Sequence, residues 1–290
     1  MALAPITIDE NTFKQNFNLP PLSRTLLQVL EAIHSKVSGA AEVTEFVSRD
    51  AAMVTHLLKV VNSAYYALSR RIGNLQHAIA YLGLGEVSRI CLTLSVINSL
   101  KPADKNDLRY FWYHSYLTAL IAKSLSKEFK GAIDAGDLYS AALLHDIGQL
   151  VYQRFYPDHF SQLRRYSTEE GVFLIDAEDH FGFPSHITFG SLLCEHWGMP
   201  ANVKRACTFH ELKDLRTIAD RSRSEPFDVI ITISNLIAGL ATAKLQEELK
   251  EQVASEVRRV LEMTKEQFLG FLAQVYELEK KAKSAISQMI

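Results

Sequence analysis

The sequence is poor in glycine and proline, the residues that most often end helices and form turns. It contains 13 glycines and 8 prolines in 290 residues, which is roughly 7% against roughly 12% in average proteins. A chain with many short strands needs frequent turns and therefore more of both residues. The scarcity favours a fold made of helices.

Cysteines and long apolar runs are also scarce. The three cysteines, Cys91, Cys194 and Cys207, are an odd number spread over a long chain, so no disulfide framework is expected. The longest apolar stretch, residues 229–243, is interrupted by a serine and an asparagine and is shorter than the roughly 18 residues of a membrane span. The N-terminus lacks the basic region that begins a secretory signal. We therefore expect a cytoplasmic protein that does not cross a membrane.

Neither sign of charge dominates the chain. It has 31 Lys plus Arg and 33 Asp plus Glu residues, a net charge of −2. This balance gives no electrostatic reason to expect a nucleic acid as a partner. Hydrophobic residues make up 48% and charged residues 22%, a composition that argues against intrinsic disorder.

Apolar residues recur at helical spacing along nearly the whole chain, so the predicted class is all-α. A polar break at residues 101–105 separates two helical lobes. We expect the lobes to pack closely, because segment 86–100 is apolar on nearly all sides. The expected parts are an N-terminal tail (1–16), an N-terminal lobe (17–102), a helical core (103–245) and C-terminal amphipathic helices (246–290). Beyond the break, helices are predicted near 107–129, 135–147, 157–168, 170–181, 185–197, 200–212 and 264–288.

Four histidines lie on the apolar stripes of their own predicted helices: His114, His145, His186 and His210. Any one of them is explained more simply as a core histidine bonded to the backbone. Four buried imidazoles, each needing a polar partner, are harder to explain one by one. A shared metal ion would satisfy all of them, because neutral imidazole is a good metal ligand.

The adjacent pair His145-Asp146 supports this interpretation. Neighbouring residues on a helix diverge by about 100°, so both can reach one ion only if the ion lies beside their turn. Gly148 then allows another segment of the chain to approach closely.

A zinc site built from cysteine and histidine is the alternative. Cys194-x-His196 and Cys207-x-x-His210 resemble pairs of zinc ligands in their residue types and spacing. Residues two apart on a helix point about 200° away from each other, which makes a shared ion at Cys194 and His196 hard to build.

Several motifs resemble the HD superfamily of metal-dependent phosphohydrolases and, more closely, its HDOD subfamily. The segment LLHDIGQL at 143–150 is similar to the HD signature. The N-terminal segments 19–33, 48–66 (ending in NSAYY) and 74–90 resemble the first part of an HDOD domain, and 181–211, with HWGMP, resembles its second half. The resemblance implies an HD-like helical core at 103–245. It also implies His114, His145, Asp146, His186 and His210 as metal ligands, with His145 and Asp146 as the catalytic pair.

The chain also departs from this pattern. The family's last aspartate ligand falls near Asn235, which lacks the negative charge, and Gln149 stands where many active relatives have a lysine. The Gly-Tyr-Pro signature of the related cyclic-dinucleotide phosphodiesterases is absent after His210-Glu211. Asn235 and Gln149 are therefore expected to be weak ligands or neighbours of the ligands. Four imidazoles and one carboxylate balance one divalent ion better than two unless an anion is bound, so we expect one ion of iron, manganese, zinc or nickel.

Two functional classes remain open. The resemblance favours a bacterial signal-transduction protein that keeps much of the metal site and has weak or no catalysis. Its partner would be a protein of a signalling pathway, and a nucleotide or phosphate could be its ligand. The alternative is a working metal-dependent phosphohydrolase acting on a phosphomonoester or a phosphodiester such as a nucleotide, which the retained histidines favour.

Overall fold

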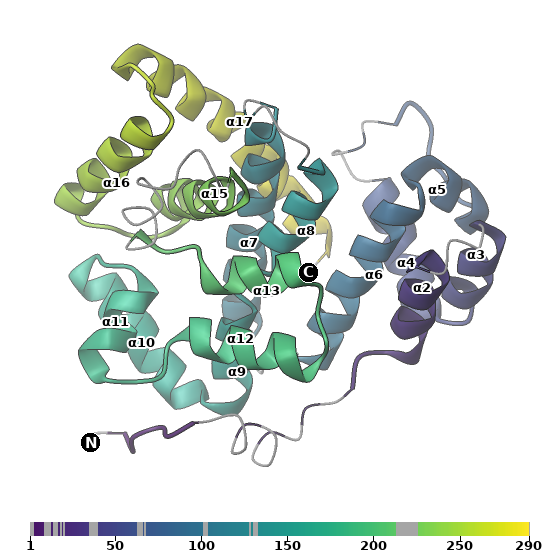
Figure 1. Ribbon diagram of the computed structural model, residues 1–290, viewed down its shortest axis with the longest axis horizontal. Helices are drawn as coiled ribbons and strands as arrows, with labels where there is room; N and C mark the ends of the chain where they lie inside the picture. The colour runs from purple at the N-terminus through teal and green to yellow at the C-terminus, as the bar shows by residue number, and fades with distance from the viewer. Residues whose placement is uncertain are drawn as a thin grey trace. The chain divides into compact units, whose positions relative to one another are not determined.

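The regular structure of the chain is helical throughout the parts that the structure describes (Figure 1). The structure is a computed structural model. It describes residues 3–8, 13, 17, 19, 21–34, 40–62, 66, 68–100, 104–127, 129, 133–212 and 226–289. No strand occurs within these ranges, which confirms the predicted all-α class.

The chain divides into two compact units. The large unit comprises Met1–Asn18 and Pro102–Ala282, and the small unit comprises Leu19–Lys101 and Lys283–Ile290. All residues of the predicted metal site belong to the large unit.

The small unit is built from five described helices that pack around leucine and valine side chains. Leu26, Val29, Val43 and Leu57 are fully buried in it. Asp50 starts one helix by accepting a hydrogen bond from the Met53 backbone N–H. The helices are α2 (Arg24–His34), α3 (Ala40–Ser48), α4 (Ala51–Val61), α5 (Leu75–Leu82) and α6 (Leu84–Ser99).

The asparagine of the NSAYY segment has a structural role. The Asn62 side chain donates to the carbonyl oxygens of Leu58 and Ile72 and accepts from the Ile72 N–H, at 2.7–2.8 Å. It therefore ties the end of α4 to the segment before α5. The following residues, Ser63 and Tyr65, lie outside the described parts of the chain.

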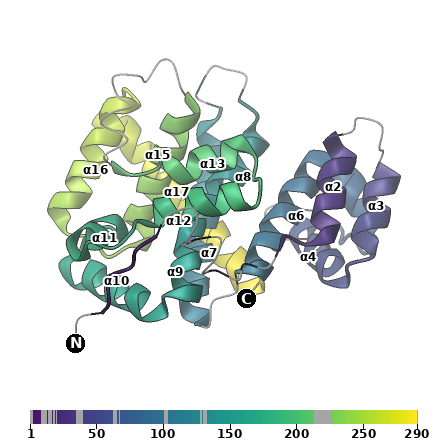
Figure 2. The same ribbon diagram turned by 60° about the horizontal axis from the view of Figure 1, so that its bottom comes forward.

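The large unit has a layered helical core. Within it α7 packs against α8 and α15, and α12 packs against α9 and α13. Both views show α12 between α9 and α13 (Figures 1 and 2). Its helices are α7 (Lys105–Leu125), α8 (Ala135–Leu144), α9 (Ile147–Phe155), α10 (Pro157–Glu170), α11 (Leu174–Phe181), α12 (His186–His196), α13 (Ala201–Thr208), α15 (Pro226–Thr242), α16 (Glu247–Val260) and the part of α17 (Lys265–Met289) up to Ala282.

Capping residues fix where the helices of the site begin. Asp104, Asp134 and Ser185 precede α7, α8 and α12, and each accepts a hydrogen bond from a backbone N–H of the first turn. The caps satisfy N–H groups that have no partner within the first turn of a helix. His114 lies on α7 and His186 is the first residue of α12.

Two predicted boundaries differ from the structure at the HD pair. The helix expected at 135–147 ends at Leu144, and a further helix, α9, follows at Ile147–Phe155, where none was predicted. The chain leaves helical geometry at Asp146, whose φ and ψ are −98° and 14°. This turn, rather than a continuous helix, lets His145 and Asp146 point at the same centre.

Gly148 allows the close approach expected for it. A Cβ atom at this position would lie 1.8 Å from the carbonyl oxygen of His186 and 2.7 Å from the backbone nitrogen of Gly190. Only glycine therefore fits between α9 and α12.

Among the described helices, none alone has the length and hydropathy of a membrane span. The pair Leu75–Leu82 and Leu84–Val96 meets those criteria only when taken together, across a bend of 110°.

Candidate metal centre

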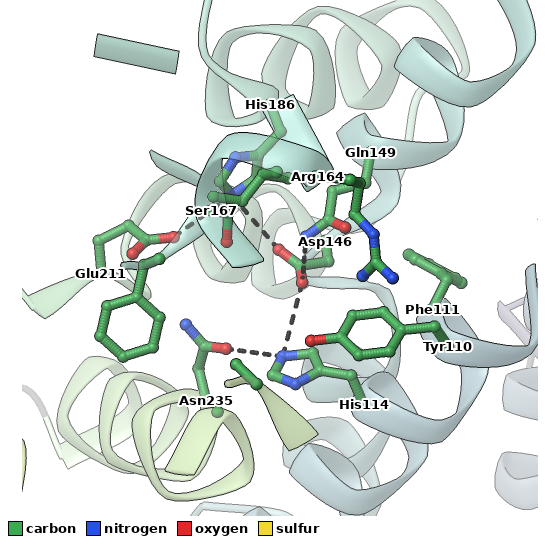
Figure 3. A pocket seen from close by; sticks show the side chains of 14 residues that line it. Tyr110, Phe111, His114, Asp146, Gln149, Arg164, Ser167, His186, Glu211 and Asn235 are labelled. Atoms are coloured by element: carbon green, nitrogen blue, oxygen red, sulfur yellow. Dashed lines mark hydrogen bonds and ion pairs between the residues drawn. The ribbon is translucent and has the colours of Figure 1, made fainter. Parts of the chain in front are cut away.

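The side chains predicted to bind a metal lie together in the large unit. Figure 3 shows three of them, His114, Asp146 and His186, around a pocket. His114 is 12% exposed at its side chain, and the others are buried. They come from α7 (His114), the turn between α8 and α9 (His145 and Asp146), the start of α12 (His186), the segment after α13 (His210) and α15 (Asn235).

The first cluster consists of His114, His145 and Asp146, with Asn235 beside it. Asp146 Oδ2 lies 3.5 Å from His114 Nε2 and 3.3 Å from His145 Nε2. Asn235 Oδ1 lies 2.8 Å and 3.1 Å from the same two nitrogens. The amide oxygen of Asn235 thus faces the first cluster.

The second cluster consists of Asp146, His186 and His210, with Glu211 beside it. The other oxygen of Asp146, Oδ1, lies 3.4 Å from His186 Nε2 and 3.3 Å from His210 Nε2. Glu211 Oε1 lies 3.3 Å from each of these nitrogens, which are 3.0 Å apart. Asp146 is therefore shared, with one oxygen facing each cluster.

These spacings fit a tetrahedral ion in the second cluster. Bonds of about 2.0–2.1 Å place the ligand atoms of a tetrahedral site roughly 3.3–3.4 Å apart. Asp146 Oδ1 and Glu211 Oε1 each lie 3.3–3.4 Å from the Nε2 atoms of His186 and His210, which are 3.0 Å apart. Each of these five distances is close to the edge of such a tetrahedron.

Hydrogen bonds at the outer nitrogens determine which nitrogen of each imidazole faces the centre. His145 Nδ1 donates to Ala142 O at 2.7 Å, and His210 Nδ1 donates to Ala206 O at 2.9 Å. A carbonyl oxygen only accepts, so the hydrogen of each neutral ring is on Nδ1. The Nε2 lone pairs of His145 and His210 then point inward.

The other two histidines are held in the same way. His186 Nδ1 donates to the buried carboxylate of Glu178 at 2.9–3.0 Å. His114 Nδ1 lies 3.0 Å from the hydroxyl of Thr242, which accepts because it donates its own hydrogen to Ala238 O. When neutral, all four rings therefore present Nε2 as an acceptor, the form that binds a metal. When His186 or His210 is protonated, its Nε2 instead carries a hydrogen that faces Asp146 and Glu211.

Asn235 presents an acceptor as well. Its amide nitrogen donates to the carbonyl oxygen of His210 at 2.8 Å, so its Oδ1 faces His114 and His145. With neutral imidazoles no hydrogen lies between this oxygen and the two nitrogens. A cation is the group that such converging lone pairs require.

Burial and charge act differently on the two clusters. In the first, burial lowers the pKa of His114 to about 4 against the opposing charge of Asp146. Burial also acts to lower the pKa of His210, but hydrogen bonds to Asp146 and Glu211, together with their charges, raise it to about 9. Burial would raise the pKa of Glu211, yet hydrogen bonds from His186 and His210 hold it well below its usual range. The second cluster therefore attracts positive charge more strongly.

A small pocket opens onto both clusters. Its volume is about 60 Å³, and Asp146, His114, Glu211, Tyr110 and Arg164 are among the residues that line it (Figure 3). This is the room of a few water molecules and well below the roughly 300–1,000 Å³ of a typical ligand pocket.

Gln149 does not point freely into this pocket. Its amide nitrogen donates to Asp146 Oδ2 at 2.7 Å. It therefore orients the shared carboxylate, and it brings no positive charge to a phosphate.

Three residues of the site were missed by the sequence reasoning. Glu211 repeats beside His210 the adjacent pattern of His145 and Asp146, a signal that was present but not used. Glu178 is fully buried on α11 three residues after Ile175, so an acid on an apolar helix face was the signal for it. Arg164 had no signal, since a pair of neighbouring arginines is most often solvent-exposed.

The cysteine–histidine alternative finds no support within the described residues. Cys194 and Cys207 are buried with their Sγ atoms 3.7 Å apart, and Cys207 Sγ contacts Leu144 O. His196 is exposed on α12. The groups that could hold an ion in these parts of the chain are the two clusters above, and neither contains a cysteine.

Comparison with known families decides the membership of the chain. The model of the HDOD domain matches residues 19–212, which is two thirds of the sequence. The chain belongs to the HDOD family. The match includes the HD pair, all four histidines of the centre and Glu211, and it ends before Asn235.

Solved structures with the same fold cover almost the whole chain. An HDOD domain protein of unknown function from Geobacter sulfurreducens has a TM-score of 0.70 at 20% identity, covering 95% of this chain and 96% of that one. A Shewanella amazonensis protein, named provisionally as a phosphohydrolase, has a TM-score of 0.69 at 17% identity and covers 97% of each chain. These similarities support the fold.

Among the curated relatives, an uncharacterized protein from Treponema pallidum is 25% identical over 193 residues. The match covers 67% of this chain but 37% of that protein. This HDOD chain thus corresponds to about a third of the length of that relative.

Proposed function

We propose that this chain is a regulatory HDOD protein whose HD centre binds a divalent transition metal and hydrolyses phosphate esters slowly or not at all. The observation that carries the proposal is the contrast between the two clusters that share Asp146. The second has Glu211 as an additional carboxylate, whereas the first has the neutral amide of Asn235.

The ligands proposed for the ion that binds first are Asp146, His186, His210 and Glu211. Their two carboxylates balance one divalent cation, which avoids an uncompensated buried charge. His114 and His145, with the other oxygen of Asp146 and the amide oxygen of Asn235, offer a second and weaker position. Iron, manganese, zinc and nickel all suit such nitrogen and oxygen donors. We therefore expect one ion per chain at low metal concentration.

A bound ion supplies Lewis acidity and lowers the pKa of a bound water. The side chains that line the pocket add little to that chemistry. Gln149 orients Asp146 and is neutral, and the small pocket leaves no room for a whole nucleotide. These features favour a metal centre that controls conformation or binding over one with rapid turnover.

The proposed output of the protein is an interaction with a protein partner in a signalling pathway. A structurally similar protein from Marinobacter aquaeolei, with a TM-score of 0.72 and 19% identity, is named provisionally as a signal transduction protein. The alternative function, a metal-dependent phosphohydrolase, is supported by the complete set of donors in the second cluster.

Turnover by metal-loaded protein separates the two functions. The chain would be loaded with Mn²⁺, its metal content measured, and its activity assayed with p-nitrophenyl phosphate and bis(p-nitrophenyl) phosphate. We expect bound metal and a kcat below about 0.01 s⁻¹, roughly a hundredfold under the slow end of typical enzymes. A kcat of about 1 s⁻¹ or more that His145→Ala abolishes would contradict the regulatory function and establish the phosphohydrolase.

A further inference from the structure

One wall of the pocket carries a positive charge that the metal ligands do not use. Arg164, from α10, lines this wall together with Tyr110 of α7 and Ser167 of α10. Figure 3 shows the guanidinium on the opposite side of the pocket from Glu211. The side chain of Arg164 is 31% exposed, so it lies where the pocket meets solvent.

The guanidinium is held in place by its neighbours. Its Cζ lies 3.9 Å from the centroid of the Tyr110 ring, a short cation–π contact. Its Nε is 3.8 Å from Asp107 Oδ1, an ion pair beyond hydrogen-bond distance. A guanidinium has five N–H donors, more than these two neighbours take up. The donors that Tyr110 and Asp107 do not take up are available to an oxyanion.

The charges around the pocket favour an anion. Asp146, Glu178 and Glu211 are buried carboxylates within the centre, and Asp107 offsets the charge of Arg164 at the mouth of the pocket. Ions at both clusters would bring four positive charges against the three buried carboxylates. An anion in the pocket would cancel the excess positive charge.

We propose that Arg164, supported by the face of Tyr110, is the binding residue for a terminal phosphoryl group whose other oxygens face the two clusters. This inference rests on the proposed metal centre and names the class of ligand that it takes. A terminal phosphoryl group is a dianion and fits a volume of about 60 Å³. A phosphodiester has two substituents rather than one, so it fits a pocket of this volume less well.

Phosphate binding to Mn²⁺-loaded protein tests the inference. Isothermal titration calorimetry would use inorganic phosphate, with methyl phosphate and dimethyl phosphate as small probes of the monoester and the diester. Arg164→Gln should weaken phosphate binding about 10- to 100-fold, the effect of losing charge-assisted hydrogen bonds. Arg164→Lys should retain part of the affinity. The matched control is Arg165→Gln, which removes the same charge from an exposed neighbour on α10 and should leave binding within about twofold.

Metal analysis of the protein with and without phosphate gives a second result. Phosphate should raise the Mn²⁺ content of wild-type protein from one ion toward two, because ligands that stabilise each other bind cooperatively. Arg164→Gln should show a smaller rise. Far-ultraviolet circular dichroism and thermal unfolding would confirm that each variant is folded.

Several results would overturn the inference. The first is phosphate binding by Arg164→Gln with wild-type affinity, and the second is a loss of phosphate affinity in Arg165→Gln as large as that in Arg164→Gln. The third is binding of dimethyl phosphate as tight as that of methyl phosphate. The fourth is the absence of phosphate binding by metal-loaded wild-type protein. The metal analysis separates failure of the proposed metal centre from failure of the phosphate subsite. Protein that takes up no metal but binds phosphate through Arg164 would refute the metal centre and leave the subsite.

Discussion

Substitution of Gly148 by alanine tests the packing that places His186 in the centre. The new Cβ would lie 1.8 Å from His186 O, and ordinary contact begins at 3.4 Å, so the two helices must separate by about 1.6 Å there. The atoms it meets are backbone atoms of α12, which cannot turn aside as a flexible side chain can. Overpacking costs typically about 1–3 kcal/mol. We expect Gly148→Ala to lower the free energy of unfolding by about 3 kcal/mol.

The same shift should weaken metal binding. α12 begins at His186, whose Nε2 is 3.4 Å from Asp146 Oδ1 and 3.3 Å from Glu211 Oε1. A displacement of about 1 Å or more takes this nitrogen out of the arrangement of the second cluster. We expect the affinity for the first ion to fall about 10- to 100-fold, the range seen when the groups that orient a metal ligand are lost.

Urea unfolding and a calorimetric Mn²⁺ titration would measure both effects. Gly270→Ala is the matched control, because Gly270 lies within α17 and its added Cβ meets nothing within 4 Å. Alanine is favoured over glycine in a helix by up to about 1 kcal/mol, so this variant should be slightly more stable than wild type, with unchanged metal affinity. Gly148→Ala within about 0.5 kcal/mol of wild type would refute the close approach of α9 and α12.

Three further substitutions test the donor set. Asn235→Asp adds a carboxylate to the first cluster and should raise the Mn²⁺ content at saturation toward two ions per chain; an unchanged count by atomic absorption would show that the missing aspartate belongs elsewhere. Glu211→Gln should weaken the first ion about 10- to 100-fold in a calorimetric titration, whereas Glu195→Gln, on the exposed side of α12, should have no effect, and equal affinities would remove Glu211 from the ligand set. Glu178→Gln keeps an acceptor for His186 Nδ1 but removes its charge, so it should cost about 10-fold in affinity; a wild-type titration curve would show that Glu178 does not tune the ligand.

The sequence alone was sufficient for the fold class and for the grouping of the histidines. His114 and His186 could be found because a polar residue on an apolar helical stripe stands out from its neighbours. His145 and Asp146 stood out as an adjacent pair in an apolar context. Each of these signals is local, within one or two helical turns.

The residues that were missed depend on contacts between distant segments. Glu211 follows the end of α13, where no helical period indicates which way a side chain points. Arg164 enters the pocket because α10 lies against α7, where Tyr110 supports it. The turn at Asp146 is likewise set by packing of α9 against α12, which no short window of sequence contains. The number of ions expected from the sequence also rested on one carboxylate, before Glu211 was placed beside the second cluster.

Anomalous X-ray diffraction from crystals grown with zinc tests the metal centre most directly. The account predicts a peak at the zinc absorption edge within about 2.0–2.2 Å of Asp146 Oδ1, His186 Nε2, His210 Nε2 and Glu211 Oε1. A second and weaker peak beside His114 and His145 should strengthen when phosphate is added. A fully ordered large unit with no peak at either cluster, or with zinc only at Cys194 and Cys207, would contradict the account.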